Sequence, residues 1–116
     1  MGWSRYRTWL LPALQDDCPG GEAELLSHIA SGRAQLWAGR GAALVTERVC
    51  DAGVHSLHVW LAGGELSEIL ALRPGIEAWA RAQGCQFITI DGRPGWARVL
   101  RTHGYVGDGD LLRGKL

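Results

Sequence analysis

The stretch that decides the fold is residues 55–62, HSLHVWLA, followed by Gly63-Gly64, a helical segment to Gln83, Gly84, and residues 85–90, CQFITI. Both apolar runs have the length of buried strands, and the segment between them is long enough to be a crossover helix. Such a βαβ unit is parallel and right-handed. Ligands of open α/β sheets usually bind beyond the carboxyl ends of parallel strands. We therefore expect a cleft bordered by Gly63, Gly64 and Arg93.

The segments on either side complete a single domain spanning residues 1–116. Before the βαβ unit they predict a helix from Trp3, which Pro12 should bend or end, and a second helix at 22–31. Strands are then expected at 35–38 and 42–50, with turns at 39–41 and 51–53. After the βαβ unit we expect a helix carrying Trp96, Val99 and Leu100 and an edge strand at 111–116. The predicted class is α/β (α+β) with a mixed sheet, in which an antiparallel meander leads into a parallel βαβ unit.

The composition excludes several classes of function. The 116 residues include 12 basic and 12 acidic side chains, so no basic excess favours nucleic-acid binding. No apolar run reaches the roughly 18 residues of a membrane span, and the first residues lack a signal-peptide pattern. Cys18, Cys50 and Cys85 form no C-x-x-C pair, which indicates reduced, mostly buried thiols and no zinc site.

Several segments resemble the GNAT acetyltransferases. Residues 76–85, IEAWARAQGC, resemble the family's A-R-x-x-G-C approach to its fifth strand, and residues 101–105, RTHGY, resemble its ending after the last helix. The set WLAGG at 60–64, WAR at 79–81 and GRPGW at 92–96 is more similar still to small GNAT-like proteins of tailed phages and prophages. The resemblance covers less than half of the chain. It implies a GNAT-like acyltransferase fold and a phage setting.

The residues that would carry acetyl transfer depart from the family pattern. In GNAT enzymes the turn after the fourth strand binds the CoA pyrophosphate, but here Glu65 and Glu68 follow the glycines and would repel it. The family's general acid, a Tyr, corresponds to Leu100, so the resemblance implies no catalytic residue. If acetyl-CoA does bind, the residues expected to hold it are Leu61, Gly63, Gly64 and Arg93.

The remaining conspicuous residues are histidines and tryptophans. His55 and His58 lie three apart on a strand, so their side chains should point to opposite faces and bind no metal together. Trp79 and Trp96 fall on predicted buried stripes. The other candidates for the protein surface are Trp3, Trp9 and Trp37, which we predict as interface residues. Arg93 is equally a candidate for gripping an anion and for capping neighbouring carbonyls.

Two functions from different classes remain. The first is a non-catalytic GNAT-fold protein of a phage or prophage, without a cofactor, that binds itself or other phage structural proteins through its tryptophans and the edge strand at 111–116. It would reside in the host cytoplasm, and in the virion if it is a virion component. The alternative is an acetyl-CoA-dependent N-acetyltransferase. Nucleic acid, membrane and metal are not expected partners.

Overall fold

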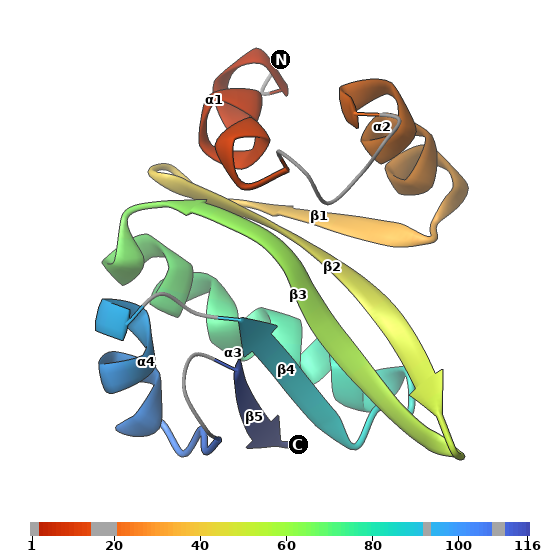
Figure 1. The fold of residues 1–116 in the computed structure, drawn as a ribbon, viewed down its shortest axis with the longest axis vertical. Coiled ribbons are helices and arrows are strands. Elements are labelled where there is room, and N and C mark those ends of the chain that lie inside the picture. Colours follow the sequence, from red (N-terminus) through yellow and green to blue (C-terminus); the bar gives the residue numbers. More distant parts are fainter. Residues whose placement is uncertain (1–2, 15–20, 92–93, 108–110) are drawn as a thin grey trace.

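The computed structural model describes residues 3–14, 21–91, 94–107 and 111–116, with the side chains of 13, 14, 91 and 94–97 left out (Figure 1). Within these residues the helices and strands follow the predicted order. The elements are α1 (Trp3–Leu14), α2 (Gly21–Ser31), β1 (Ala34–Ala38), β2 (Ala42–Asp51), β3 (Val54–Gly64), α3 (Leu66–Ala82), β4 (Phe87–Asp91), α4 (Pro94–Arg101) and β5 (Leu111–Lys115).

The strands form one five-stranded sheet in the order β1-β2-β3-β4-β5. Only the β3–β4 pair is parallel, with Ser56 opposite Phe87 and Val59 opposite Ile90, and the other neighbours are antiparallel. The helix α3 connects the two parallel strands. The prediction of a mixed α/β sheet, with an antiparallel meander leading into a parallel βαβ unit, is therefore confirmed.

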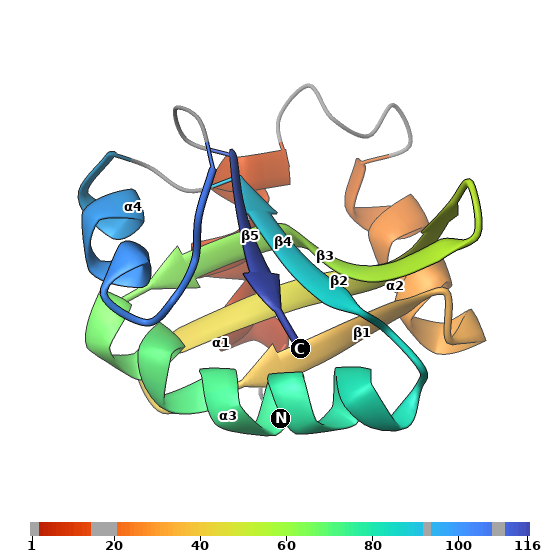
Figure 2. The same cartoon turned by 90° about the horizontal axis from the view of Figure 1, so that it is seen from below.

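Helices cover the sheet from both sides. Figures 1 and 2 show α1 and α2 over one face of β1–β3, and α3 and α4 on the other face. The core on the α1/α2 side consists of Leu10, Leu25, Ala34, Ala43, Val45 and Leu61. The larger core on the α3/α4 side includes Leu44, Leu57, Val59, Ile76, Ile88, Ile90, Leu100, Tyr105 and Leu112. Each face of the sheet thus has its own apolar layer.

A β-bulge in β3 changes which side chains face which layer. Thr46 lies opposite Val59 and Val45 opposite Leu61, so Trp60 is the extra residue on β3. Before the bulge Leu57 and Val59 belong to the α3 side, whereas after it Leu61 belongs to the α1/α2 side. A one-residue insertion reverses the alternation of a strand because side chains repeat every two residues. The last part of β3 is therefore oriented differently from its first part.

The two described helices that have a proline in their interior, α1 and α3, are both continuous. The helix α3 runs without a break through Pro74, so the crossover is one helix. The helix α1 continues past Pro12 to Leu14, so Pro12 does not end it. Each proline leaves one helical N–H hydrogen bond unmade, and the helix nevertheless continues on both sides of it.

The cysteines differ from expectation in one respect. Cys85 is buried as predicted, but Cys50 is exposed on β2, and Cys18 lies outside the described residues. Across the described ranges, no helix is long and apolar enough to cross a membrane.

Candidate functional site

The carboxyl ends of the two parallel strands separate, as the sequence predicts for a site. The pairing between β3 and β4 ends at Val59 and Ile90, while β3 continues to Gly64 beside β2 alone. The bulge at Trp60 lies at this point and bends the strand. Since β4 stops near the separation, the last residues of β3 have one edge that no strand of the sheet pairs with.

Gly63 lies under helix α1. It is buried, and a Cβ added at this position would overlap the Trp9 carbonyl oxygen and lie 2.9 Å from the Trp9 Cβ. The backbone of α1 therefore approaches β3 as closely as only glycine permits. The glycine is therefore explained by packing of the chain on itself.

Gly64, the next residue, also permits a close backbone contact. Its φ of +106° is a conformation that side-chain-bearing residues rarely adopt, and an added Cβ would overlap the Gly41 carbonyl oxygen and approach Ala42. The end of β3 thus packs against the β1–β2 hairpin. Both glycines of the predicted phosphate turn are needed for close backbone contacts within the chain, Gly63 in the interior and Gly64 at the surface.

The turn itself is short and carries negative charge. Glu65 alone separates β3 from α3, and its backbone N–H donates to the Gly41 carbonyl oxygen at 2.9 Å. Its carbonyl oxygen accepts from the N–H groups of Glu68 and Ile69 at 3.1 Å. The side chains of Glu65 and Glu68 lie beside Gly41, so two carboxylates stand at the amino end of α3. They stabilise the helix dipole and repel an incoming anion.

The other residues predicted to hold acetyl-CoA do not add to such a site. Leu61 is 1% exposed and belongs to the α1/α2 core, where its side chain packs and cannot line a cleft. Arg93 lies outside the described residues. The structure therefore brings Gly63 and Gly64 together at the strand end, and it places Leu61 inside.

Leu100, at the position of the family's acid, and Tyr105, expected to be a packing aromatic, are both buried. Leu100 is an apolar core residue. The Tyr105 hydroxyl donates to the Glu77 carboxylate at 2.8 Å, and Arg73 binds the same carboxylate at 2.9 Å. Burial, followed by the hydrogen bond to Glu77, raises the pKa of Tyr105 well above its ordinary value. Tyr105 is therefore a packing residue, as predicted, and holds its proton firmly.

The space next to these side chains is small. A cavity of about 30 Å³ lies between α3 and the sheet and is lined by Val59, Ile90, Leu100 and Tyr105 among others. This is room for about one water molecule, and ligand sites are usually ten times larger. This cavity, as the described residues form it, is therefore too small for an acyl cofactor.

The three tryptophans predicted at an interface are half-buried and have partners within the chain. The Trp3 indole donates to Glu22 at 2.8 Å, and the Trp37 indole donates to Thr46 at 3.0 Å and packs edge-on against Trp79. Trp9 packs with Tyr6 and under the Arg5 guanidinium. Each indole packs at the edge of the core with part of its surface exposed. That a partner binds these indoles stays a prediction.

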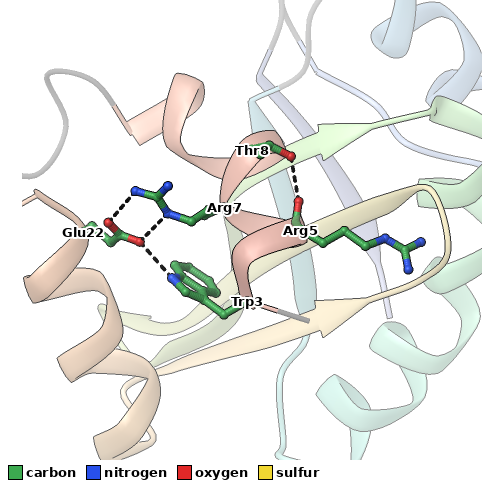
Figure 3. Close-up of polar contacts among 5 residues, drawn as sticks. All are labelled: Trp3, Arg5, Arg7, Thr8 and Glu22. Carbon is green, nitrogen blue, oxygen red and sulfur yellow. Dashed lines mark hydrogen bonds and ion pairs between the residues drawn. The ribbon is translucent and has the colours of Figure 1, made fainter. Parts of the chain in front are cut away.

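One of these contacts joins α1, which covers Gly63, to α2. Glu22 on α2 accepts from the Trp3 indole and from the Nε and Nη2 groups of Arg7, the latter two at 2.8 and 2.9 Å (Figure 3). The hydrogen bond from Arg7, followed by that from Trp3, lowers the pKa of Glu22 to about 2. We call Trp3, Arg7 and Glu22 the α1–α2 clamp, since they hold α1 in place beside α2.

The histidines at 55 and 58 have separate partners. The His58 Nδ1 lies 2.8 Å from the Thr89 hydroxyl on β4, and the His55 Nε2 lies 3.9 Å from the Cys50 thiol on β2. Within the described part of the chain, no three His, Cys, Asp or Glu side chains gather closely enough to hold a metal ion. Sequence reasoning missed both pairs. The Cys50–His55 pair had a signal, because a two-residue turn after Asp51 places positions 50 and 55 opposite each other.

No protein-family model, curated protein or solved structure matches this chain. The similarity to GNAT proteins and to phage proteins therefore stays a prediction from sequence motifs.

Proposed function

We propose that this protein is a non-catalytic, protein-binding domain of GNAT type, a phage or prophage component that binds itself or another phage structural protein. The observation that carries the non-catalytic part is the packing of Gly63 and Gly64. Both glycines are occupied by contacts with Trp9 and Gly41, and the turn that follows presents Glu65 and Glu68. These features oppose the binding of a pyrophosphate. The GNAT and phage assignments rest on the sequence resemblance.

The edge of β5 supports a role in protein binding. Val106 and Leu111 are 63% and 58% exposed, the highest values among the exposed large hydrophobic side chains of the described residues. They lie at the same edge, because Val106 exchanges backbone hydrogen bonds with Arg113 and Gly107 contacts the backbone of Leu111. The hydrogen bonds to Val106 already occupy backbone groups in the middle of β5. A partner would therefore bind this edge mainly through the apolar side chains beside it, and less through free backbone groups.

One observation favours the alternative, an acetyl-CoA-dependent N-acetyltransferase. The separation of β3 and β4 leaves one edge of the last β3 residues without a strand partner. The pantetheine arm of CoA contains amide groups that can pair with such an edge in the manner of an added strand. This reading needs a phosphate site elsewhere than at Gly63 and Gly64.

The two functions separate in a CoA titration. A ligand at 100 times its dissociation constant stabilises a fold by about 2.7 kcal/mol. We expect the melting temperature to stay nearly unchanged up to millimolar acetyl-CoA. A clear rise at micromolar acetyl-CoA, together with acetylation of a test amine, would replace the proposal by the enzyme.

The protein-binding role is tested by light scattering of the chain alone and mixed with phage structural proteins. We expect self-association or a stable complex that Val106→Asp or Leu111→Asp weakens at least tenfold. Val54→Asp is the matched control, because Val54 is 39% exposed at the far end of the molecule on the β2–β3 hairpin. If the chain remains monomeric in every mixture, the protein-binding role is wrong.

A further inference from the structure

The β2–β3 hairpin extends beyond the rest of the sheet and borders an open hollow. The pairing of β1 with β2 begins at Ala34 and Glu47, so the end of β2 projects past β1. The hollow has a volume of about 490 Å³. The hollow is lined by residues of α2, β2 and β3 and of the segments just before β1 and β4. The titratable and charged residues among them are His28, Arg33, Glu47, Arg48, Cys50, His55 and Cys85.

A thiol and an imidazole face each other at this hollow. Ala52 and Gly53, with φ of +52° and +80°, form a two-residue turn between Asp51 and Val54. This geometry is that of a tight hairpin, and it places Cys50 directly opposite His55. The Cys50 Sγ lies 3.9 Å from the His55 Nε2, and both side chains are exposed. The thiol is thus accessible to a reagent and has a proton acceptor beside it.

The charge around the pair favours an anionic reagent. Arg33 and Arg48 line the hollow against the single carboxylate of Glu47. The Arg48 guanidinium donates from Nη1 to Gln83 at 3.3 Å, which directs this long side chain along the hollow. Two guanidinium groups within one open site attract carboxylate-bearing molecules, and Arg binds carboxylates well.

We propose that Cys50 is a site of reversible thiol–disulfide exchange with small anionic disulfides of the glutathione class. The Cys50 thiol gives its proton to His55 as its sulfur attacks one sulfur of the disulfide. A new bond forms between Cys50 and that sulfur while the original S–S bond breaks. The departing thiolate takes the proton from His55 and leaves as a thiol. The disulfide is the oxidant, and the reverse reaction restores Cys50.

The second thiol in the hollow does not compete for the reagent. Cys85 is only 7% exposed, and burial raises the pKa of its thiol. A buried thiol with a raised pKa is a poor nucleophile, because the thiolate is the reacting form. The structure therefore separates a reactive position, Cys50, from an inert one, Cys85.

The experiment measures the rate of mixed-disulfide formation on the intact chain with oxidised glutathione at pH 7, with the modified residue mapped by mass spectrometry. We expect one glutathionyl group on Cys50, formed about tenfold faster than on an unstructured peptide containing residues 48–52. His55→Gln should remove most of this advantage, and Cys50→Ser should abolish the adduct. Cys85→Ser is the matched control and should react as the unchanged chain does.

The preference for an anionic reagent is tested with cystamine, a cationic disulfide. The rate ratio of oxidised glutathione to cystamine should exceed that of the unstructured peptide severalfold, and Arg33→Gln with Arg48→Gln should lower it. Circular dichroism confirms that each variant is folded. The proposal is overturned if Cys50 reacts no faster than the peptide, if His55→Gln has no effect, if Cys85 is modified first, or if the rate ratio equals that of the peptide.

Discussion

The two ends of strand β3 differ in how the chain uses them. At the carboxyl end, Gly63 is buried under α1 and Gly64 packs against the β1–β2 hairpin, so other parts of the chain fill the positions that a Cβ would take. At the amino end, the hairpin projects past β1, and Cys50 and His55 lie exposed beside a hollow of about 490 Å³. The end whose sequence looks like a ligand-binding motif is the packed one, and the end without a motif is open.

This difference shows that a glycine pair has more than one physical explanation. Glycines can expose backbone to a ligand or allow two segments of the chain to approach closely. Both explanations predict glycine at the same positions, so the sequence cannot distinguish them. They differ only in which atoms lie where the missing Cβ would be, and here those atoms belong to Trp9, Gly41 and Ala42.

The largest effect is expected from Gly63→Ala. The new methyl group would overlap the α1 backbone, so we expect a loss of about 3 kcal/mol in the free energy of unfolding, measured by urea denaturation. Gly75→Ala is the matched control, because Gly75 lies in α3 with nothing within 4 Å of its Cβ position. It should stabilise the protein by about 0.5–1 kcal/mol. Equal stability of Gly63→Ala and the unchanged chain would show that the carboxyl end is open.

A smaller effect is expected from the α1–α2 clamp that keeps this end covered. The folded pKa of Glu22 is about 2, below its ordinary value, so the carboxylate stabilises the fold above the unfolded pKa of about 4.5. This contribution is lost as the pH falls through about 2. We expect Glu22→Gln to lower the melting temperature at pH 6 and to speed hydrogen exchange in α1. The difference from the unchanged chain should shrink towards pH 2.

The control for the clamp is Glu47→Gln, which alters a carboxylate on β2 outside the α1–α2 contact. Its effect on hydrogen exchange in α1 should be negligible at both pH values. If Glu22→Gln leaves α1 exchange unchanged at pH 6, the clamp does not hold α1 over Gly63.

The smallest effect is expected at the open end. Ala52 has a φ of +52°, which costs a side-chain-bearing residue about 1–2 kcal/mol, whereas glycine adopts it freely. Glycine also loses more conformational entropy on folding, and this cost offsets part of the gain. We therefore expect Ala52→Gly to stabilise the protein by about 0.5 kcal/mol. Ala52→Val should destabilise it by about 1 kcal/mol, since branched side chains fit this conformation worst. Denaturant unfolding of both variants measures the difference, and a destabilised Ala52→Gly would contradict the turn geometry.

Much of the fold could be predicted because it depends on local patterns. The order of elements follows from apolar runs separated by turn residues, and the parallel βαβ unit follows from two strands joined by a long helix. The bulge at Trp60 could not be predicted, because it is defined by pairing with β2, and nothing in the strand itself marks it. Of the two effects expected of Pro12, bending or ending α1, the second does not occur, because the helix continues to Leu14.

The candidate site divides in the same way. Features that depend on residue type and spacing along one element could be predicted from the residues alone. They are the acidic turn with Glu65 and Glu68, the apolar Leu100, and the opposite directions of His55 and His58. Only the tertiary structure decided that Gly63 and Gly64 lie against other parts of the backbone, that Cys50 is exposed beside His55, and that Trp3 and Trp37 are tied to Glu22 and Thr46. Those outcomes depend on which distant segments meet, and the free energy of such contacts belongs to pairs of segments and not to either sequence by itself.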